Sequence, residues 1–290
     1  MIRKLLLGSV AAGGLLAAAL PASAADLAVA PAPAPVVVAP AFTWSGWYIG
    51  GNGGAKWGHA HGDLVAAPVP GFAATAGGAF VPFGLDNNGF FAQDGHNGTW
   101  VGGGQLGFNW QFGNLVFGLE GDVDATDIKR GFVLGAAPPP PGTFGGIFIP
   151  GDAFRFKNDW QASLRARGGI AFGRFLLYAT GGVAWAGVQM DALYSPGFVG
   201  AVPVPGAAFS ESKTLTGGTI GLGGEFAVTN NVSFGVEYRY SDFGRETFNL
   251  GAIPFPAGAG STVVGSADLR THEVTARLNI RFGGLFGFAP

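Results

Sequence analysis

Residues 98–124 read GTWVGGGQLGFNWQFGNLVFGLEGDVD, and this stretch decides the fold. In residues 100–112 the even positions are apolar or glycine, while the odd positions include three amides. After Gly113-Asn114 the alternation resumes, with apolar residues at odd positions and acids at even ones. A period of two is typical of a β-strand with one apolar face, and a two-residue connection containing glycine is typical of a hairpin. The stretch therefore predicts two antiparallel strands joined by a tight turn.

The same period recurs along the chain and predicts eight strands, within residues 47–57, 100–112, 115–124, 159–172, 175–185, 220–226, 232–240 and 273–282. Three connections are very short, at 113–114, 173–174 and 229–231. The other four, roughly 59–98, 127–157, 189–212 and 244–268, are long. Short turns at one end and long loops at the other are typical of transmembrane β-barrels. We therefore predict an all-β fold, an eight-stranded antiparallel up-and-down barrel with short periplasmic turns and four long extracellular loops.

The composition excludes several other classes of protein. Glycine accounts for 53 of 290 residues and charged residues for only 12%, which is unlike an ordinary cytosolic enzyme. A hydrophobic content of 48% argues against disorder over most of the chain. The chain has no cysteine, which excludes thiolate chemistry, and its net charge of -2 gives no reason to expect a nucleic-acid partner.

The N-terminal region predicts export. Arg3 and Lys4 precede an apolar run at 5–20, and Ala22-Ser23-Ala24 matches an A-x-A cleavage site. An uncleaved anchor is less favoured, because the run is shorter than the ~20 residues of a membrane-spanning helix. We expect a signal peptide at 1–24, a Pro/Ala-rich periplasmic spacer at 25–43, the barrel at 44–282 and a short C-terminal extension at 283–290.

Aromatic residues near the ends of the predicted strands favour a membrane barrel over a soluble β-sandwich, which shows the same alternation. All seven tryptophans lie near strand ends, with Trp44 expected on the short-turn side. Aromatic rings gather at the two interfaces of a bilayer. The predicted interfacial aromatics are Trp47, Trp57, Trp100, Trp110, Trp160, Trp185 and Phe282.

Charged residues occupy the polar faces of the predicted strands. An eight-stranded barrel leaves an interior about wide enough for side chains to fill, so these charges need partners inside it. The predicted structural network in the lumen comprises Glu120, Asp122, Asp124, Arg165, Arg167, Glu225, Glu237, Arg239, Glu273, Arg277 and Arg281, and Asp159 is counted with its acids. On a solvated sandwich the same residues would be ordinary surface charges.

The alternation also predicts how single substitutions should behave. Leu119→Arg, on the lipid side near the midplane, should cost about 2 to 4 kcal/mol. Gly118→Ser, on the lumen side, should be much milder.

Three patterns suggest catalytic or metal chemistry, but each is weak. The glycines of 102–107 match G-x-G-x-x-G, but the strand alternation continues through them where a dinucleotide site needs a helix. His59-x-His61-x-Asp63 has metal-capable side chains beside a predicted loop. His272 has no serine or second acid placed next to it by spacing. We therefore predict no catalytic, cofactor or metal site.

Several stretches resemble the small opacity-type, porin-like outer-membrane barrels of Gram-negative bacteria, which are surface antigens. These stretches are FTWSGWYIG at 42–50, GGQLGFNWQ at 103–111, VFGLEGD at 116–122, FGRFLLYATGG at 172–182 and TNN at 229–231. The resemblance implies an eight-stranded barrel of the OmpA/OmpX type, an outer-membrane location and no enzymatic activity. Such chains typically end at the aromatic terminus of the last strand, whereas here eight residues follow Phe282.

Three functions are compatible with these observations. We favour a structural and surface-display protein over a small-solute porin, because open porins use about 16 to 18 strands. The third is an adhesin or ligand binder that works through its loops. The expected partners are outer-membrane lipids, the outer-membrane assembly machinery and extracellular ligands of the loops. No cofactor is expected.

Overall fold

The computed structural model describes residues 42–66, 79–84, 91–94, 98–134, 151–199, 202–253 and 261–282. These ranges do not include the predicted signal peptide at 1–24, most of the predicted spacer or the predicted C-terminal segment at 283–290. Among the described residues, no helix is long and apolar enough to cross a membrane.

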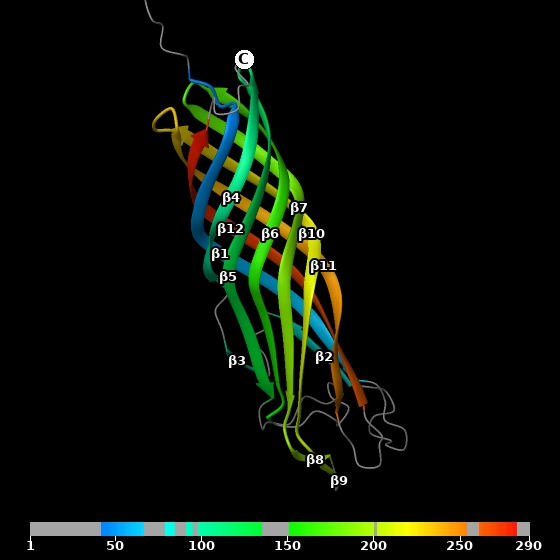
Figure 1. Ribbon diagram of the computed structural model, residues 1–290. Coiled ribbons are helices and arrows are strands. Elements are labelled where there is room, and N and C mark those ends of the chain that lie inside the picture. The colour runs from blue at the N-terminus through cyan, green and yellow to red at the C-terminus, as the bar shows by residue number, and fades with distance from the viewer. Residues whose placement is uncertain are drawn as a thin grey trace, which may run out of the picture. The chain divides into compact units, whose positions relative to one another are not determined.

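Eight long strands form a closed antiparallel ring, as predicted (Figure 1). They are β1 (Gly46–Ala66), β4 (Gly98–Phe112), β5 (Leu115–Leu134), β6 (Ala153–Phe172), β7 (Phe175–Tyr194), β10 (Ala207–Ala227), β11 (Val232–Ile253) and β12 (Ser261–Phe282). Each strand pairs with the next one in this order, and β12 pairs with β1 from Trp47↔Phe282 to Ala66↔Val263. The ring therefore has no open edge at the level of the short turns.

The short turns form as the sequence predicts. Gly113 and Gly173, between β4 and β5 and between β6 and β7, have φ values of 59° and 61°. Glycine adopts this left-handed conformation without the strain that a Cβ would bring. The turns, the start of β1 and the end of β12 lie together at the upper end in Figure 1.

The long strands reach further into the long connections than the sequence pattern predicts. The described parts of these connections also contain four short strands: β2 (Ala79–Gly84) pairs with β1, β3 (Phe91–Asp94) pairs with β5, and β8 (Gly197–Val199) pairs with β9 (Val202–Val204). The predicted loop boundaries are therefore wrong, because residues at the ends of the ranges 59–98, 127–157, 189–212 and 244–268, inside these ranges, continue the strands.

At the level of the short turns and the middle of the strands, the exposed face is apolar and the buried face is polar. Leu164 and Leu222 are 57% and 65% exposed, while Glu120 and Arg165 are each 1% exposed. A soluble sandwich has the opposite arrangement, so the predicted transmembrane assignment accounts for the burial pattern. We call this part the membrane level, and it extends along the barrel from the height of the Trp47 side chain to that of the Trp57 side chain. Its ten-residue rise, at about 3.3 Å per residue and about 40° of tilt, spans about 25 Å, the height of a barrel's apolar band.

Beyond the membrane level, toward the long connections, the two faces are exchanged. We call this part the extension. Its inward side chains are apolar and buried: Ile128, Phe154, Phe156, Val188, Met190, Ala192, Tyr194, Leu215, Phe243, Phe248, Leu250, Val263, Ala267 and Leu269. Its outward positions include charged residues such as Lys129, Arg155 and Arg270. The extension therefore has an apolar core, like a protein in water, and charged side chains on its outer face.

β-Bulges lie near this boundary. In β6 the ladder with β7 skips Asp159, between Asn158 and Trp160. In β11 the ladder with β12 shifts between Asp242 and Arg245, beside Gly244 with its φ of 66°. A bulge adds one residue to one strand and so changes which face the following residues occupy.

Candidate functional site: the charged lumen and its short-turn mouth

The lumen at the membrane level contains six acids and six bases, each at most 4% exposed. The acids are Glu120, Asp122, Asp124, Glu225, Glu237 and Glu273, and the bases are Lys56, Arg165, Arg167, Arg239, Arg277 and Arg281. Their formal charges cancel. Ions buried in this way are stable only when they are paired and hydrogen-bonded.

The middle layer of the lumen is a ring of ion pairs around two arginines. Arg165 lies 2.5 Å from Glu120, 2.5 Å from Glu237 and 3.0 Å from Asp122. Arg277 pairs with both Glu120 and Glu237. These residues come from β5, β6, β11 and β12, so the layer joins opposite walls of the barrel.

Two tyrosines complete the middle layer. Tyr48 donates a hydrogen bond to Glu120 at 2.6 Å, and Tyr178 donates one to Glu237 at 2.9 Å. Glycines face both rings: a Cβ on Gly107 would lie 2.3 Å from the Tyr48 ring, and one on Gly223 would lie 2.4 Å from the Tyr178 ring. The two rings fit only because these glycines have no side chain.

The layer toward the extension is centred on Arg239. Its guanidinium lies 2.8 Å from Asp122, 3.3 Å from Asp124 and 3.4 Å from Glu273. Lys56, fully buried on β1, lies 3.2 Å from Glu273 and donates to Gln161 at 2.5 Å. The sequence prediction missed Lys56, although its even position, nine residues after Trp47, already assigns it to the inward face.

Asp159 does not belong to the lumen, contrary to our expectation. It is exposed, because the bulge in β6 turns this residue outward and places Asn158 inside. The sequence predicts seven acids and five bases in the lumen. With Asp159 removed from that set and Lys56 added, the lumen has six of each.

Gly118 faces inward, but it has no room for a side chain. A Cβ there would lie 2.4 Å from Asn109 Oδ1 and 2.6 Å from the backbone oxygen of Phe108. The expectation that Gly118→Ser is mild is therefore wrong, because a backbone atom would have to move.

The layer nearest the short turns pairs Arg167 with Glu225. The Arg167 guanidinium also lies 3.6 Å from the centre of the Tyr178 ring, and Glu225 accepts hydrogen bonds from Ser233 at 2.5 Å and Asn279 at 3.0 Å. Arg281, which we expected in the lumen network, is buried at the short-turn end. Its guanidinium faces the chain that precedes β1.

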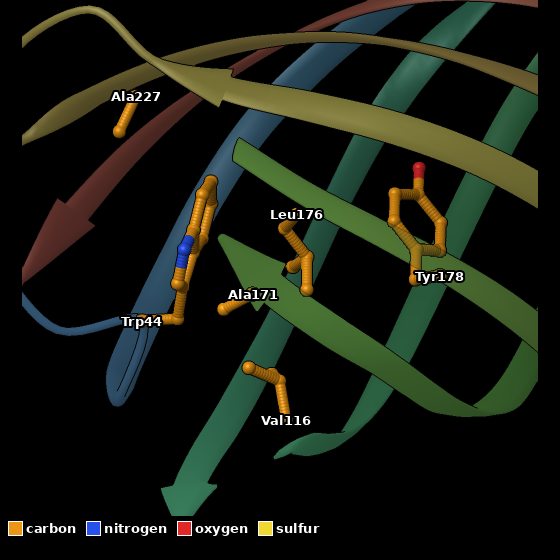
Figure 2. Packing of buried hydrophobic residues seen from close by; sticks show 6 residues of the cluster. All are labelled: Trp44, Val116, Ala171, Leu176, Tyr178 and Ala227. Atoms are coloured by element: carbon orange, nitrogen blue, oxygen red, sulfur yellow. The ribbon is translucent and has the colours of Figure 1, made fainter. Parts of the chain in front are cut away.

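Trp44 closes the mouth of the lumen at the short-turn end (Figure 2). It is 0% exposed and packs in a buried cluster with Val116, Ala171, Leu176, Tyr178 and Ala227. Trp44 lies on the short-turn side, as expected, but its ring is buried in the mouth of the lumen and does not face lipid as that of Trp47 does. Its position just before the first strand lets it turn into the barrel, where no strand alternation fixes its direction.

The comparison with known proteins follows the same architecture. Residues 12–282 match the family model described as outer membrane protein beta-barrel domain. The chain belongs to this family. In outer-membrane barrels the short turns face the periplasm and the long loops face outward.

Two outer-membrane proteins from other bacteria are similar in sequence to this barrel. A 22 kDa outer membrane protein of Rhizobium leguminosarum bv. viciae is 29% identical over 76% of this chain and 74% of its own length. A 31 kDa outer-membrane immunogenic protein of Brucella melitensis is 31% identical over 84% of this chain and 88% of its own length. The chain is thus located in the outer membrane, like these relatives.

Solved structures with a similar fold are also outer-membrane barrels. The outer membrane protease OmpT from Escherichia coli aligns with a TM-score of 0.46 and 12% identity, over 84% of this chain and 99% of its own. OprG from Pseudomonas aeruginosa aligns with a TM-score of 0.42 and 10% identity, over 82% and 97%. Similarity at this level says nothing about what this barrel does.

The outer-membrane barrel has aromatic side chains at both edges of its apolar band. Toward the short turns, Trp47, Trp110 and Phe282 are 42%, 46% and 38% exposed. Toward the extension, Trp57, Trp100 and Trp160 are 41%, 57% and 39% exposed, and Trp185 is half-buried. These positions are those at which amphipathic rings settle in a bilayer.

Of the remaining sequence candidates, the structure describes the glycines of 102–107 and His272. The glycines of 102–107 lie within β4, which stays paired with β1 and β5 throughout. The side chains of His59, His61 and Asp63 lie outside the part that the structure describes. His272 contacts Tyr238, with 2.8 Å between its Nδ1 and the tyrosine oxygen, and no group of three or more metal-capable side chains forms among the described residues.

Proposed function

We propose that this protein is a closed, non-enzymatic barrel that supports the outer membrane and displays its long loops on the cell surface. The observation that supports this most is the lumen, in which twelve charged groups are buried and eleven of them, all except Arg281, form ion pairs with one another across the barrel. An open channel for solutes needs groups that are hydrated and can release their partners. Here each ion would first have to separate desolvated pairs, which is costly.

Both ends of the lumen add to this argument. At the short-turn end Trp44 fills the mouth. At the other end the inward side chains of the extension are apolar, including the buried Leu215, Phe243 and Leu269. Apolar interiors of this kind give a permeating ion no polar partner.

The same pairing supports a non-enzymatic role. A general base or nucleophile must reach a substrate, and the lumen acids are at most 4% exposed and bonded to arginine, lysine or tyrosine. The barrel's partners are then the lipids around its apolar band and the assembly machinery that inserts it.

Conductance in planar bilayers tests the closed lumen. We expect rare or very small openings from the wild-type protein, and more leak from the Arg165→Ala/Arg239→Ala double variant. Frequent, stable and large steps from the wild-type protein would overturn the proposal in favour of the porin alternative.

Epitope tags test surface display. A tag inserted within residues 135–150, between β5 and β6, should bind antibody on intact cells. A tag at Asn230, in the turn between β10 and β11, should bind only after the outer membrane is permeabilised. The reverse result would invert the barrel. The loop-mediated adhesin remains the alternative if such cells bind a surface ligand that loop substitutions abolish.

A further inference from the structure

The chain immediately before β1 crosses the short-turn mouth of the barrel. We call residues 42–45 the strap. The strap leaves the wall at Gly46, whose φ of 124° is a conformation that L side chains rarely adopt. Glycine is therefore needed where the chain turns from the wall into the mouth.

Hydrogen bonds hold the strap to three separate parts of the barrel. The backbone N–H of Trp44 donates to Gln111 Oε1 at 2.7 Å, near the end of β4. Its indole N–H donates to the carbonyl oxygen of Gly173 at 3.1 Å, in the turn between β6 and β7. Arg281, at the end of β12, donates to the carbonyl oxygen of Thr43 at 2.6 Å.

Cationic side chains pack against the aromatic rings of the strap. The Arg281 guanidinium lies 4.7 Å from the centre of the Trp44 ring and 5.0 Å from that of Phe42. Arg174 lies 5.0 Å from the Phe42 ring and also donates to Asn230 Oδ1 at 2.7 Å. The strap is thus linked directly to the end of β4 and to the turn between β6 and β7, and through Arg174 to the turn between β10 and β11.

The Trp44 ring covers the charged lumen. On its lumen side lie Leu176, which is 0% exposed, and then Tyr178 with Arg167 over its ring, while Ala227, also 0% exposed, lies on the other side of the Trp44 ring at the rim of the mouth (Figure 2). The strap itself belongs to no strand, so its release breaks none of the wall's ladder hydrogen bonds. Segments held by few contacts can open without global unfolding.

We propose that the strap is a lid on the periplasmic mouth of the lumen, and that its release exposes the Arg167–Glu225 layer to the periplasmic solution while the barrel wall stays intact. This inference rests on the closed lumen proposed above and assigns its periplasmic seal to a single aromatic residue on a glycine hinge.

A single introduced thiol reports the state of the lid. The chain has no native cysteine, and Ala227 is fully buried in the cluster that Trp44 completes, so Ala227→Cys can be placed in the full-length protein folded in detergent. We expect slow reaction with a small charged thiol reagent while Trp44 is present. Trp44→Ala should accelerate labelling by about a hundredfold, because truncation of a buried tryptophan removes most of the contacts that keep the lid docked.

Trp47→Ala is the matched control. Trp47 lies three residues from Trp44 at the same end, but it faces lipid and is 42% exposed. Its removal should leave labelling slow. Heat-dependent gel mobility checks that each variant is folded, and Trp44→Phe should restore much of the protection. If Trp44→Ala does not fold, Gln111→Ala removes one anchor and should give a smaller acceleration.

Two results would overturn the lid: fast labelling of Ala227→Cys with Trp44 in place, or equal labelling of the folded Trp44→Ala and Trp47→Ala proteins. Wild-type conductance is a separate measurement. Large wild-type conductance would overturn the closed lumen, whereas faster labelling of Trp44→Ala with little conductance would support both proposals.

Discussion

Side chains of β7 alternate between the inside and the outside of the barrel without interruption. In one half of the strand the apolar side chains face outward, and in the other half they face inward. At the membrane level Leu177 and Val183 point outward and are exposed, while Tyr178 is buried in the lumen. In the extension Met190 is buried inside and Asp191 lies on the outer side. The difference teaches that alternation identifies a strand, whereas the medium around it decides which face is apolar.

Breaking the charged interior of the membrane level should have the largest effect. Arg165→Ala removes the partner of three buried carboxylates and should cost about 3 to 5 kcal/mol in urea-induced unfolding from vesicles. Arg155→Ala is the control, since Arg155 is exposed on the same strand in the extension and should change stability by less than about 0.5 kcal/mol. Similar losses from the two variants would contradict the difference between the levels.

Breaking the apolar interior of the extension should come next. Met190, 1% exposed, should cost about 2 to 5 kcal/mol on mutation to alanine. Leu177→Ala, on the lipid face of the same strand, should cost less, because lipid chains can fill the space that it leaves. Unfolding of both variants from vesicles measures the contrast, and a greater loss at Leu177 would argue that the extension has no packed core.

A charge placed on the outer face distinguishes the two levels directly. Leu119→Arg, in the middle of the apolar band, should cost about 2 to 4 kcal/mol. Ser212→Arg, exposed on the extension, should stay within about 0.5 kcal/mol. Equal costs for folding into vesicles would mean that the band does not end where we place it.

The smallest effect is expected at an ion pair outside the lumen. Lys157 Nζ lies 3.6 Å from Asp191 Oδ2 on the extension, and the two side chains are 24% and 26% exposed. Lys157→Ala should cost no more than about 1 kcal/mol, and added salt should reduce that cost. Lys56→Ala, which removes a fully buried partner of Glu273, should cost more and depend less on salt.

Much of the membrane level is predictable from sequence, because lipid outside and paired charges inside enforce a strict alternation. The eight strands and the closed ring follow from it, whereas the outer-membrane location was implied by the resemblance to known barrels. The same alternation could have predicted Lys56 in the lumen, because Lys56 lies on the inward face of a predicted strand.

The extension and the mouth are not predictable in the same way. In residues 186–194 apolar side chains move to the inner face, so a search for apolar outward positions ends the strand too early. Trp44 lies before the first alternating residue, where only the tertiary contacts of the mouth decide its direction. The composition of a tryptophan-rich strand end does not distinguish a ring in lipid from one in the lumen.

The bulge at Asp159 determines whether odd-numbered or even-numbered residues of β6 face inward. Inward residues are odd-numbered from Arg167 back to Gln161 and even-numbered from Asn158 back to Phe154. Deleting this one residue would turn Phe154 toward water and Arg155 inward, so its effect on the strand is comparable to that of a frameshift on a reading frame. The connection between β5 and β6 can gain or lose residues without this consequence. Length variation among such barrels should therefore be tolerated in the connections, whereas within β6 a single-residue change would need a compensating one on the same strand.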